Sequence, residues 1–182
     1  MTPILKTPRL ILRQFTPDDW PAIDAMVSDP EATRFMHFAH WDEDRRRQWF
    51  DRCVAGTDAS ADTGICWAIA RKATGLIGWF FIGNTDPPAV PGERGFGYLL
   101  DRACWGQGYM TEALRAVLDY EFQVRSTPQV RAECEIGNGA SARVMEKVGM
   151  RREKTVCDAD FEGNWAFRHH YVITRAEYRT AR

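Results

Sequence analysis

Long apolar runs, paired cysteines and leader-like segments are missing from this sequence. The longest apolar stretch, Trp79 to Ile82 with Leu76 and Ile77 nearby, is far shorter than the roughly 20 residues that span a bilayer. The N-terminus contains no continuous apolar segment of the kind found in secretory signals. The 5 cysteines include no Cys-x-x-Cys pair, so neither zinc binding nor redox chemistry is indicated. We expect reduced core thiols, no metal, no membrane contact and a cytoplasmic location.

An excess of one charge is missing as well. The chain has 24 Lys+Arg against 25 Asp+Glu, a formal net charge of -1, whereas nucleic-acid binding normally requires a basic excess or a basic stripe. The one basic run, Arg45 to Arg47, is short and is typical of a solvated helix face. We therefore expect no direct nucleic-acid partner.

The composition is that of an ordinary globular domain. The chain has 182 residues, of which 45% are hydrophobic and 27% are charged. A chain of this size buries about 70% of its unfolded surface, which is enough for a core without disulfides or a structural metal. The proline-rich segment 86–92 indicates an exposed connection, because prolines remove donors from a sheet ladder. We predict a single domain over residues 1–182.

Hydrophobic periodicity predicts the order of strands and helices. Leu10 and Leu12 have the two-residue spacing of a half-buried strand, whereas Leu114, Val117 and Leu118 share one face of a helix. The order β-α-α-β-β-β-α-β-α-β-β predicts a mixed α/β (α+β) fold with a mostly antiparallel sheet and helices on both faces. Strands are expected near residues 10–15, 65–71, 76–82, 95–100 and 130–136 and in a hairpin around 156 and 167–173, and helices near 16–29, 42–55, 109–122 and 138–147 and after Thr174.

Gly106-x-Gly108 lies between a predicted strand and a predicted helix. Such a turn gathers unpaired backbone N–H groups and the positive end of the helix dipole around one point, which suits an anion. Glycine lets phosphate oxygens approach the backbone because it has no Cβ. An ordinary short turn explains the same two glycines. The named phosphate motifs fit badly, because Thr111 replaces the third glycine of a dinucleotide fingerprint and no Gly-Lys-Ser/Thr occurs.

Ordered motifs around this turn resemble a known family. They are Gly97-Tyr98-Leu99-Leu100, then Trp105-Gly106-Gln107-Gly108-Tyr109-Met110-Thr111-Glu112-Ala113-Leu114, then Asn138-x-x-Ser141-x-Arg143-Val144-Met145-Glu146-Lys147-Val148-Gly149-Met150. The chain resembles the GNAT superfamily of acetyl-CoA-dependent N-acetyltransferases over nearly its whole length. The opening Thr7-Pro8-Arg9-Leu10-Ile11-Leu12-Arg13 and Gly75-Leu76-Ile77-Gly78 resemble its RimJ/RimL-type branch, which includes the ribosomal-protein-alanine acetyltransferases. The resemblance implies a splayed central strand pair.

The resemblance also implies a site for acetyl-CoA as the cosubstrate. Leu99 and Leu100 match a strand end, splayed by a β-bulge in the family, whose backbone pairs with the pantetheine arm. Asn138 matches a side chain that hydrogen-bonds the pantetheine, and Ser141 matches a hydroxyl near the thioester sulfur. Trp105 stands where Gln or Arg is frequent, so a polar phosphate contact is either absent there or replaced by stacking. The matching diphosphate loop and helix start comprise Trp105, Gly106, Gln107, Gly108, Tyr109, Met110 and Thr111.

The implied reaction needs no enzyme nucleophile, because a thioester is already activated. It needs a neutral amine, a stabilised oxyanion and a proton for the leaving thiolate. The backbone N–H at the Leu99–Leu100 splay is the candidate oxyanion donor. Ser141 is the candidate acid, with a helix-capping hydroxyl as the alternative. Glu135 is the candidate base, directly or through water, with an ordinary surface role as the alternative; the weaker candidates are Glu133, Glu93 and Glu162.

We predict acetyl transfer to a primary amine, either a protein N-terminal α-amine or the amine of a small molecule. The alternative is a non-catalytic acetyl-CoA-binding or sensor module, and a nucleotide-binding domain is a third interpretation. Exposed edge strands leave a homodimer open. His37-x-x-His40 has zinc-like spacing, but without a further ligand it better fits a substrate-side loop or a solvent face. Helical spacing assigns Trp20, Met26, Trp49 and Phe50 to the core, and the resemblance offers the acceptor wall as the alternative for some of them.

Overall fold

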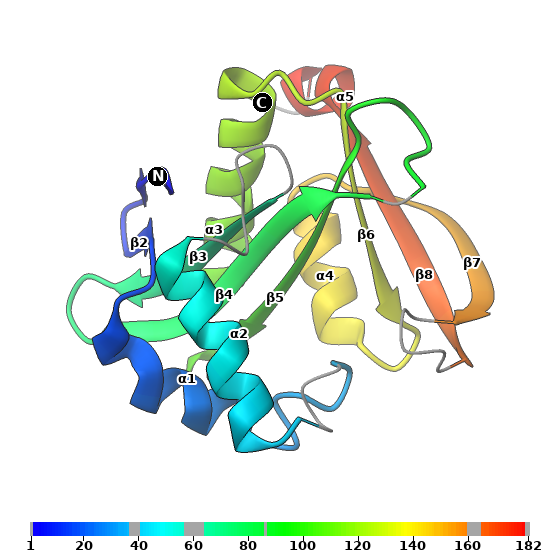
Figure 1. Cartoon of the computed structure of the whole chain (residues 1–182). Helices are drawn as coiled ribbons and strands as arrows, with labels where there is room; N and C mark the ends of the chain where they lie inside the picture. Colours follow the sequence, from blue (N-terminus) through cyan, green and yellow to red (C-terminus); the bar gives the residue numbers. More distant parts are fainter. Residues whose placement is uncertain (1, 37–40, 57–63, 86, 160–164, 181–182) are drawn as a thin grey trace.

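The chain folds into one mixed sheet with helices on both sides (Figure 1). A computed structural model describes residues 2–36, 41–56, 64–85, 87–159 and 165–180. The 8-stranded sheet has the order β1-β2-β3-β4-β5-β6-β8-β7. Neighbouring strands are antiparallel except β5 and β6, which are parallel. The strands are β1 (Leu5–Lys6), β2 (Leu10–Arg13), β3 (Gly64–Arg71), β4 (Gly75–Asn84), β5 (Arg94–Leu100), β6 (Gln129–Glu135), β7 (Arg151–Ala159) and β8 (Trp165–Thr174).

Helix ends follow local capping chemistry. The Asp42 side chain accepts from the Arg45 N–H at 2.8 Å and so begins α2. Gly56, at φ 68, ends the same helix in the left-handed conformation that glycine adopts without strain. The α-helices of the described ranges are α1 (Trp20–Val27), α2 (Glu43–Ala55), α3 (Tyr109–Asp119), α4 (Gly139–Lys147) and α5 (Arg175–Thr180).

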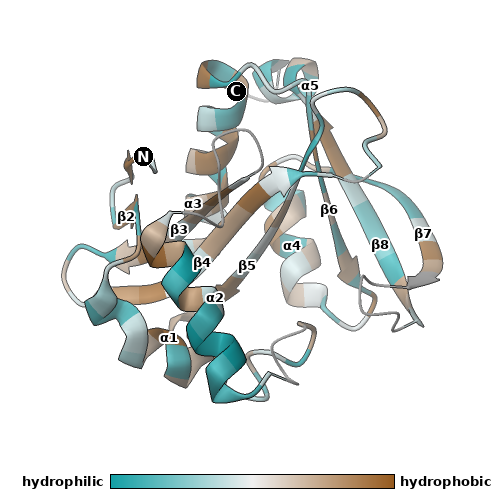
Figure 2. Ribbon diagram, in the orientation of Figure 1, coloured by the Kyte–Doolittle hydropathy of each residue, from teal (hydrophilic) through white to brown (hydrophobic). Residues whose placement is uncertain are grey.

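The two faces of the sheet carry separate cores, because successive side chains of a strand point to opposite faces. Trp67 of β3 is buried in one core with Leu114 of α3 and Met145 of α4. The next residue, Ala68, is buried in the other core with Phe50 of α2. Figure 2 shows hydrophobic segments along β3 and β4, between the helices. The prediction of helices on both faces is therefore confirmed.

The second core contains the side chains that helical spacing singled out. Met26, Trp49 and Phe50 are buried in it, and Trp20 is partly buried against it. The Trp49 ring lies 5.7 Å from the ring of Trp79 of β4. These residues attach α1 and α2 to the sheet, so their assignment to the core is confirmed.

The central strand pair diverges almost where it begins. β5 and β6 pair only through Arg94 with Val130 and Gly95 with Arg131, so the remainder of β5 faces a gap. On its other side, β5 pairs residue for residue with β4 from Gly78–Leu100 to Asn84–Arg94. The splay is confirmed, but the expected bulge in β5 is wrong. The register shift lies instead between β3 and β4, at Ile69/Ala70.

Three features differ from the sequence-based expectations or lie beyond them. The periodicity did not reveal the two-residue strand β1 or the π-helical turn Tyr120–Val124 that extends α3. Cys157 is exposed on β7, so the expectation that every thiol lies in the core is wrong. The other free cysteines, Cys53, Cys66, Cys104 and Cys134, are buried.

Within the described ranges, every helix is too short or too polar to cross a membrane.

The tight approach of β4 to β5 generates a stability prediction. A Cβ at Gly78 would lie 2.3 Å from the Leu99 carbonyl oxygen. We expect Gly78→Ala to lower the free energy of unfolding by about 1–3 kcal/mol, the typical cost of overpacking, as measured by urea denaturation. Gly97→Ala is the matched control, because a Cβ there meets nothing within 4 Å. Equal unfolding midpoints for the two variants would contradict this account of the strand contact.

Candidate active site

The turn between β5 and α3 exposes a row of backbone amides. Gly106 and Gly108 both have positive φ, 73 and 78, which favours glycine at each. The Glu112 N–H donates to the Gly108 carbonyl at 3.0 Å and is the first of the helix to find a helical acceptor. The six N–H groups from Gly106 to Thr111 have no acceptor among the described residues. Such groups at a helix start attract anions.

The space beside this turn is open. A Cβ built on Gly106 would meet no atom within 4 Å, and one on Gly108 would lie 3.6 Å from Arg9 Nη2. The amides therefore border open space rather than packed side chains. Unengaged amides, positive φ and open space together distinguish this turn from an ordinary connection.

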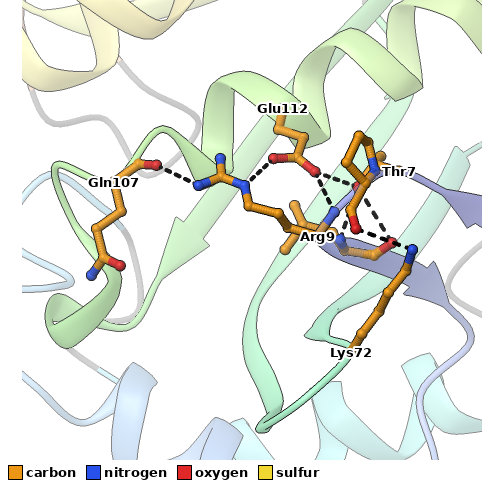
Figure 3. A network of polar contacts seen from close by, with 7 residues as sticks. Thr7, Arg9, Lys72, Gln107 and Glu112 are labelled. Carbon is orange, nitrogen blue, oxygen red and sulfur yellow. Dashed lines mark hydrogen bonds and ion pairs between the residues drawn. The ribbon is translucent and has the colours of Figure 1, made fainter.

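A network of hydrogen bonds from the segment between β1 and β2 holds the turn in place (Figure 3). Arg9 Nη1 donates to the Gln107 carbonyl at 3.0 Å, and Arg9 Nε donates to Glu112 Oε2 at 2.6 Å. Glu112 Oε1 also accepts from the Thr7 hydroxyl at 2.6 Å and from the Arg9 N–H at 2.9 Å. The Arg9 guanidinium lies 4.3 Å from the centroid of the Tyr109 ring. The network joins the turn, the start of α3 and the segment before β2.

Sequence reasoning missed the function of this network. The family motifs include Thr7, Arg9 and Glu112 but assign no role to them. The signal that could have identified them is the carboxylate of Glu112 in the first turn of α3, together with a basic residue, Arg9, for which the sequence indicates no partner. Thr7 and Arg9 lie 105 and 103 positions before Glu112 along the chain, and spacing alone does not pair them with it.

Trp105 ties the turn back to the strand. Its indole Nε1 donates to the Leu100 carbonyl at 3.0 Å, so the indole N–H is already engaged. The side chain is 45% exposed, which leaves part of the ring surface free for contact. The indole N–H could therefore reach a phosphate only by giving up this bond, and the exposed part of the ring is the surface that stacking would use.

The gap beside β5 is lined by the backbone of Leu100 rather than that of Leu99. Residues of an antiparallel strand alternate between bonding the neighbouring strand and facing away from it. The Asp101 N–H donates to the Ile77 carbonyl of β4 at 2.9 Å, and the Leu99 carbonyl lies over Gly78 of β4. The Leu100 N–H therefore points toward the gap. Of the predicted pair, Leu100 is placed to meet a bound molecule there.

The start of α4 lies across the gap. Asn138 is its N-cap, with the side-chain oxygen accepting from the Ser141 N–H at 3.1 Å. The Ser141 hydroxyl lies 2.9 Å from the Tyr98 hydroxyl of β5. The alternative role of a helix-capping hydroxyl thus belongs to the side chain of Asn138, and the Ser141 side chain faces β5 instead.

Glu133 and Glu135 lie on the face of the sheet opposite to α3 and α4. They alternate along β6 with Cys134, which is buried in the core under α3 and α4. Buried Arg168 of β8 lies between the two carboxylates, with Nη2 3.8 Å from Glu135 and Nε 3.9 Å from Glu133. His170 Nε2 lies 3.8 Å from the second oxygen of Glu133. Both carboxylates remain partly exposed, at 37% for Glu135 and 49% for Glu133.

The structure therefore places the two catalytic candidates on opposite sides of the sheet. Ser141 faces β5 from the side of α3 and α4, whereas Glu135 faces the side of α1 and α2, and the gap between β5 and β6 separates them. Phe35, in the segment after α1, lies close to Gly137, two residues after Glu135, because a Cβ on Gly137 would meet its ring at 3.4 Å.

Of the remaining candidates, the structure describes only Glu93. Glu93 is buried and accepts from Thr85 and Gln129, beside Arg131, so it anchors the connection before β5. Glu162, His37 and His40 lie outside the described residues. Within the described ranges, no cluster of three or more His, Cys, Asp or Glu side chains could hold a metal ion.

Comparison with known proteins identifies this arrangement. Residues 9–151 match the family model described as Acetyltransferase (GNAT) domain. The chain is 30% identical to the N-acetyltransferase YoaA of Bacillus subtilis (strain 168) over 157 residues, covering 84% of this chain and 85% of YoaA. A solved acetyltransferase (GNAT family) from Bacillus anthracis aligns with a TM-score of 0.82 at 24% identity, covering 96% and 100% of the two chains. Mycobacterium smegmatis RimJ, solved in complex with CoA-disulfide, aligns with a TM-score of 0.80 at 21% identity, covering 96% and 87%.

The mixed sheet, with its open central strand pair and its amide-lined turn, is a fold of the acetyltransferase type. The chain belongs to the GNAT acetyltransferase family. The resemblance drawn from the sequence motifs is confirmed, and the protein is an N-acetyltransferase.

The network around Glu112 generates a pH prediction. Burial opposes ionisation, but hydrogen bonds from Thr7 and Arg9 outweigh it and lower the pKa of Glu112. A carboxylate with a lowered pKa stabilises the folded state above its unfolded pKa, which is about 4.3, and this contribution is lost as the pH falls through the folded pKa. We expect Glu112→Gln to lower the Tm most near neutral pH, with the difference from wild type closing below about pH 4.

The measurement is thermal unfolding across this pH range. Glu31→Gln, at an exposed carboxylate after α1, is the control and should show a small difference with little pH dependence. A constant Tm difference between wild type and Glu112→Gln at every pH would show that the carboxylate stabilises the fold by shape rather than by charge.

Proposed function

We propose that the protein binds acetyl-CoA along the gap between β5 and β6 and transfers its acetyl group to a primary amine. The observation that carries this proposal is the row of unengaged amides from Gly106 to Thr111, at the end of a strand whose edge is open. A diphosphate fits such a turn, because several N–H groups and the helix dipole converge on it. RimJ of Mycobacterium smegmatis, which shares the fold, was solved with CoA-disulfide.

In this proposal the predicted binding residues would contact different parts of the cosubstrate. The amides of Gly106, Gln107, Gly108, Tyr109, Met110 and Thr111 would hold the diphosphate, with the half-exposed Trp105 ring beside them. Leu100 would pair with the pantetheine arm as an added strand does, while Leu99 holds β5 to β4. The Asn138 side-chain oxygen is occupied by its cap, so its NH₂ group is the part that remains to meet the arm. When bound, acetyl-CoA supplies an acyl group that is already activated.

The chain's own residues would then manage charge and protons. The Leu100 N–H is placed to stabilise negative charge on the acyl oxygen. Glu135, with Glu133 beside it, would remove a proton from the amine directly or through water, and Ser141 would donate to the departing sulfur on the opposite side. The acid and the base are assigned to separate residues because Ser141 and Glu135 lie on opposite sides of the sheet. The acceptor would approach past Phe35, Glu133 and Glu135.

The acceptor is a primary amine, either a protein N-terminal α-amine or the amine of a small molecule. A free α-amine has a pKa of about 8, so about a tenth is neutral at pH 7, whereas a lysine amine is neutral at only about 0.04%. An α-amine therefore demands less of a base that is half-exposed and paired with Arg168. We place the reaction in the cytoplasm, where the five free thiols would stay reduced.

The deciding experiment is incubation of the purified protein with acetyl-CoA and a panel of amines, with detection of the released thiol. We expect release above background with at least one acceptor, accompanied by an acetylated product in the mass spectrum. Tight binding of acetyl-CoA without turnover on any amine would favour a non-catalytic sensor module. Tighter binding of ATP than of CoA in calorimetry would favour a nucleotide-binding domain.

Introducing a negative charge into the turn tests the diphosphate site directly. We expect Gly106→Asp to raise the KM for acetyl-CoA at least about tenfold above that of Gly106→Asn. Both side chains tolerate the left-handed backbone better than most and differ chiefly in charge, so the asparagine variant controls for strain. The measurement is initial rate against acetyl-CoA concentration. Equal KM values would show that no anion binds at this turn.

The base is tested on the acceptor side of the gap. We expect Glu135→Gln to lower kcat by on the order of 10²-fold, with a smaller loss at higher pH, where more amine is already neutral. The measurement is the pH profile of kcat with a confirmed acceptor. Glu153→Gln, at a carboxylate on β7 that pairs with Arg131, should keep the wild-type rate. An unchanged profile in Glu135→Gln would assign the carboxylate to the surface.

A further inference from the structure

Tyr98 provides a contact that the reaction scheme above does not use. Its hydroxyl lies 2.9 Å from Ser141 Oγ and joins β5 to the first turn of α4. We propose that Tyr98 is a positioning residue for acetyl transfer, whose hydroxyl donates to the Ser141 oxygen and so directs the Ser141 hydrogen toward the leaving sulfur. This inference rests on the proposed function and gives a role to Tyr98, to which the motifs and the family comparison assigned none.

The Tyr98 ring is held firmly enough to aim its hydroxyl. It stacks with the rings of Phe80, at 5.9 Å, and Phe96, at 6.0 Å, with interplanar angles of 25° and 17°. Phe80 is fully buried in the core under α3 and α4. A tyrosine side chain has few rotatable bonds, so ring packing of this kind leaves its hydroxyl little freedom.

The opposite member of the pair is held as well. The N-cap bond from the Ser141 N–H to Asn138 fixes the backbone of Ser141 in the first turn of α4. The Ser141 side chain then approaches the gap from a defined direction. The contact with Tyr98 favours the side-chain rotamer that places the Ser141 oxygen toward β5, and a hydrogen bond accepted by that oxygen influences where its own hydrogen points.

The direction of donation follows from the chemistry of the two hydroxyls. Either hydroxyl can donate, but a phenol is the stronger donor because it is more acidic than an aliphatic alcohol. Burial raises the pKa of the Tyr98 phenol, against the hydrogen bond with Ser141, which lowers it. The phenol therefore keeps its proton at every working pH. Tyr98 donates, Ser141 accepts, and one hydrogen of the pair remains for a third partner.

The proton balance of the step is then complete. The C–N bond forms as the C–S bond breaks, the nitrogen loses one proton to Glu135, and the sulfur gains one from Ser141 Oγ. Tyr98 keeps its own proton and holds the Ser141 oxygen while that oxygen is short of one. Water returns the proton from Glu135 to Ser141 and closes the cycle, so no other reactant is needed.

A double-variant comparison tests whether Tyr98 acts through Ser141. We expect Tyr98→Phe to lower kcat roughly tenfold and Ser141→Ala to lower it on the order of 10²-fold, both with the KM for acetyl-CoA unchanged. The double variant should match Ser141→Ala alone, because Tyr98 has nothing left to position. Losses that multiply in the double variant, or a rise in KM without a change in kcat, would overturn the proposal.

A matched control separates this role from general stability. Tyr178→Phe removes a hydroxyl that bonds Asp119 at 2.9 Å, in α5 and away from the gap, and should leave kcat unchanged. Should Tyr98→Phe fail to fold, 3-fluorotyrosine at position 98 alone keeps the ring and the hydroxyl. Its more acidic phenol should change kcat in the wild-type background and not in Ser141→Ala, and an equal change in both would contradict the proposal.

A measurement without turnover distinguishes failure of this proposal from failure of the proposed function. The thiolate absorbance of CoA bound to the protein reports the pKa of the bound thiol. We expect this pKa to rise in Tyr98→Phe and in Ser141→Ala, with no further rise in the double variant. If the protein binds CoA but acetylates no amine, the titration still decides the role of Tyr98. If wild-type and variant titrations coincide while acetylation proceeds, the proposed function stands and Tyr98 has no such role.

Discussion

The early divergence of two parallel strands is the constraint on which the candidate site depends. After two residue pairs, β5 and β6 part, and the backbone of β5 loses its neighbour on that side. Buried backbone groups ordinarily find partners, so an open strand edge inside a sheet is costly unless something else pairs with it. The divergence therefore leaves the backbone of β5 without a neighbouring strand on the side that the Leu100 N–H faces.

What surrounds the gap keeps it from closing. On one side, β5 is joined to β4 over its whole length, with Gly78 allowing close contact at its end. On the other side, β6 is joined to β8 over seven residue pairs. Each half of the sheet therefore has its own strand pairing, and α3 and α4 pack over strands of both halves in one core. The site is built from the edges of two finished halves, which explains how unsatisfied backbone persists there.

Much of the fold could be predicted from the sequence, because its signals are local. Asp42 and Gly56 mark the two ends of α2, the alternation from Val130 to Cys134 identifies β6, and Asn138 begins α4. The turn from Gly106 to Gly108 could be predicted in the same way, since glycines between a strand and a helix are a local pattern. The resemblance to the family then supplied the splay of the central strands, which periodicity does not reveal.

Other parts of the site could not be predicted, because they depend on contacts between distant segments. The choice of Leu100 over Leu99 depends on the phase of the hydrogen bonds between β4 and β5, which composition does not record. The bond between Tyr98 and Ser141 joins residues 43 positions apart. The bulge expected in β5 lies between β3 and β4 instead, because a register shift depends on both strands of a pair.

The ion pair between Arg9 and Glu112 has a consequence for how the chain folds during its synthesis. These residues are separated by 103 positions, so the first strands to leave the ribosome wait for more than half of the chain before this contact can form. Contacts of such high sequence separation form late, because loop closure must be completed first. The turn from Gly106 to Thr111 therefore reaches its final shape only after both ends of this span have met. A chain still under synthesis lacks the folded turn until Glu112 has emerged and met Arg9.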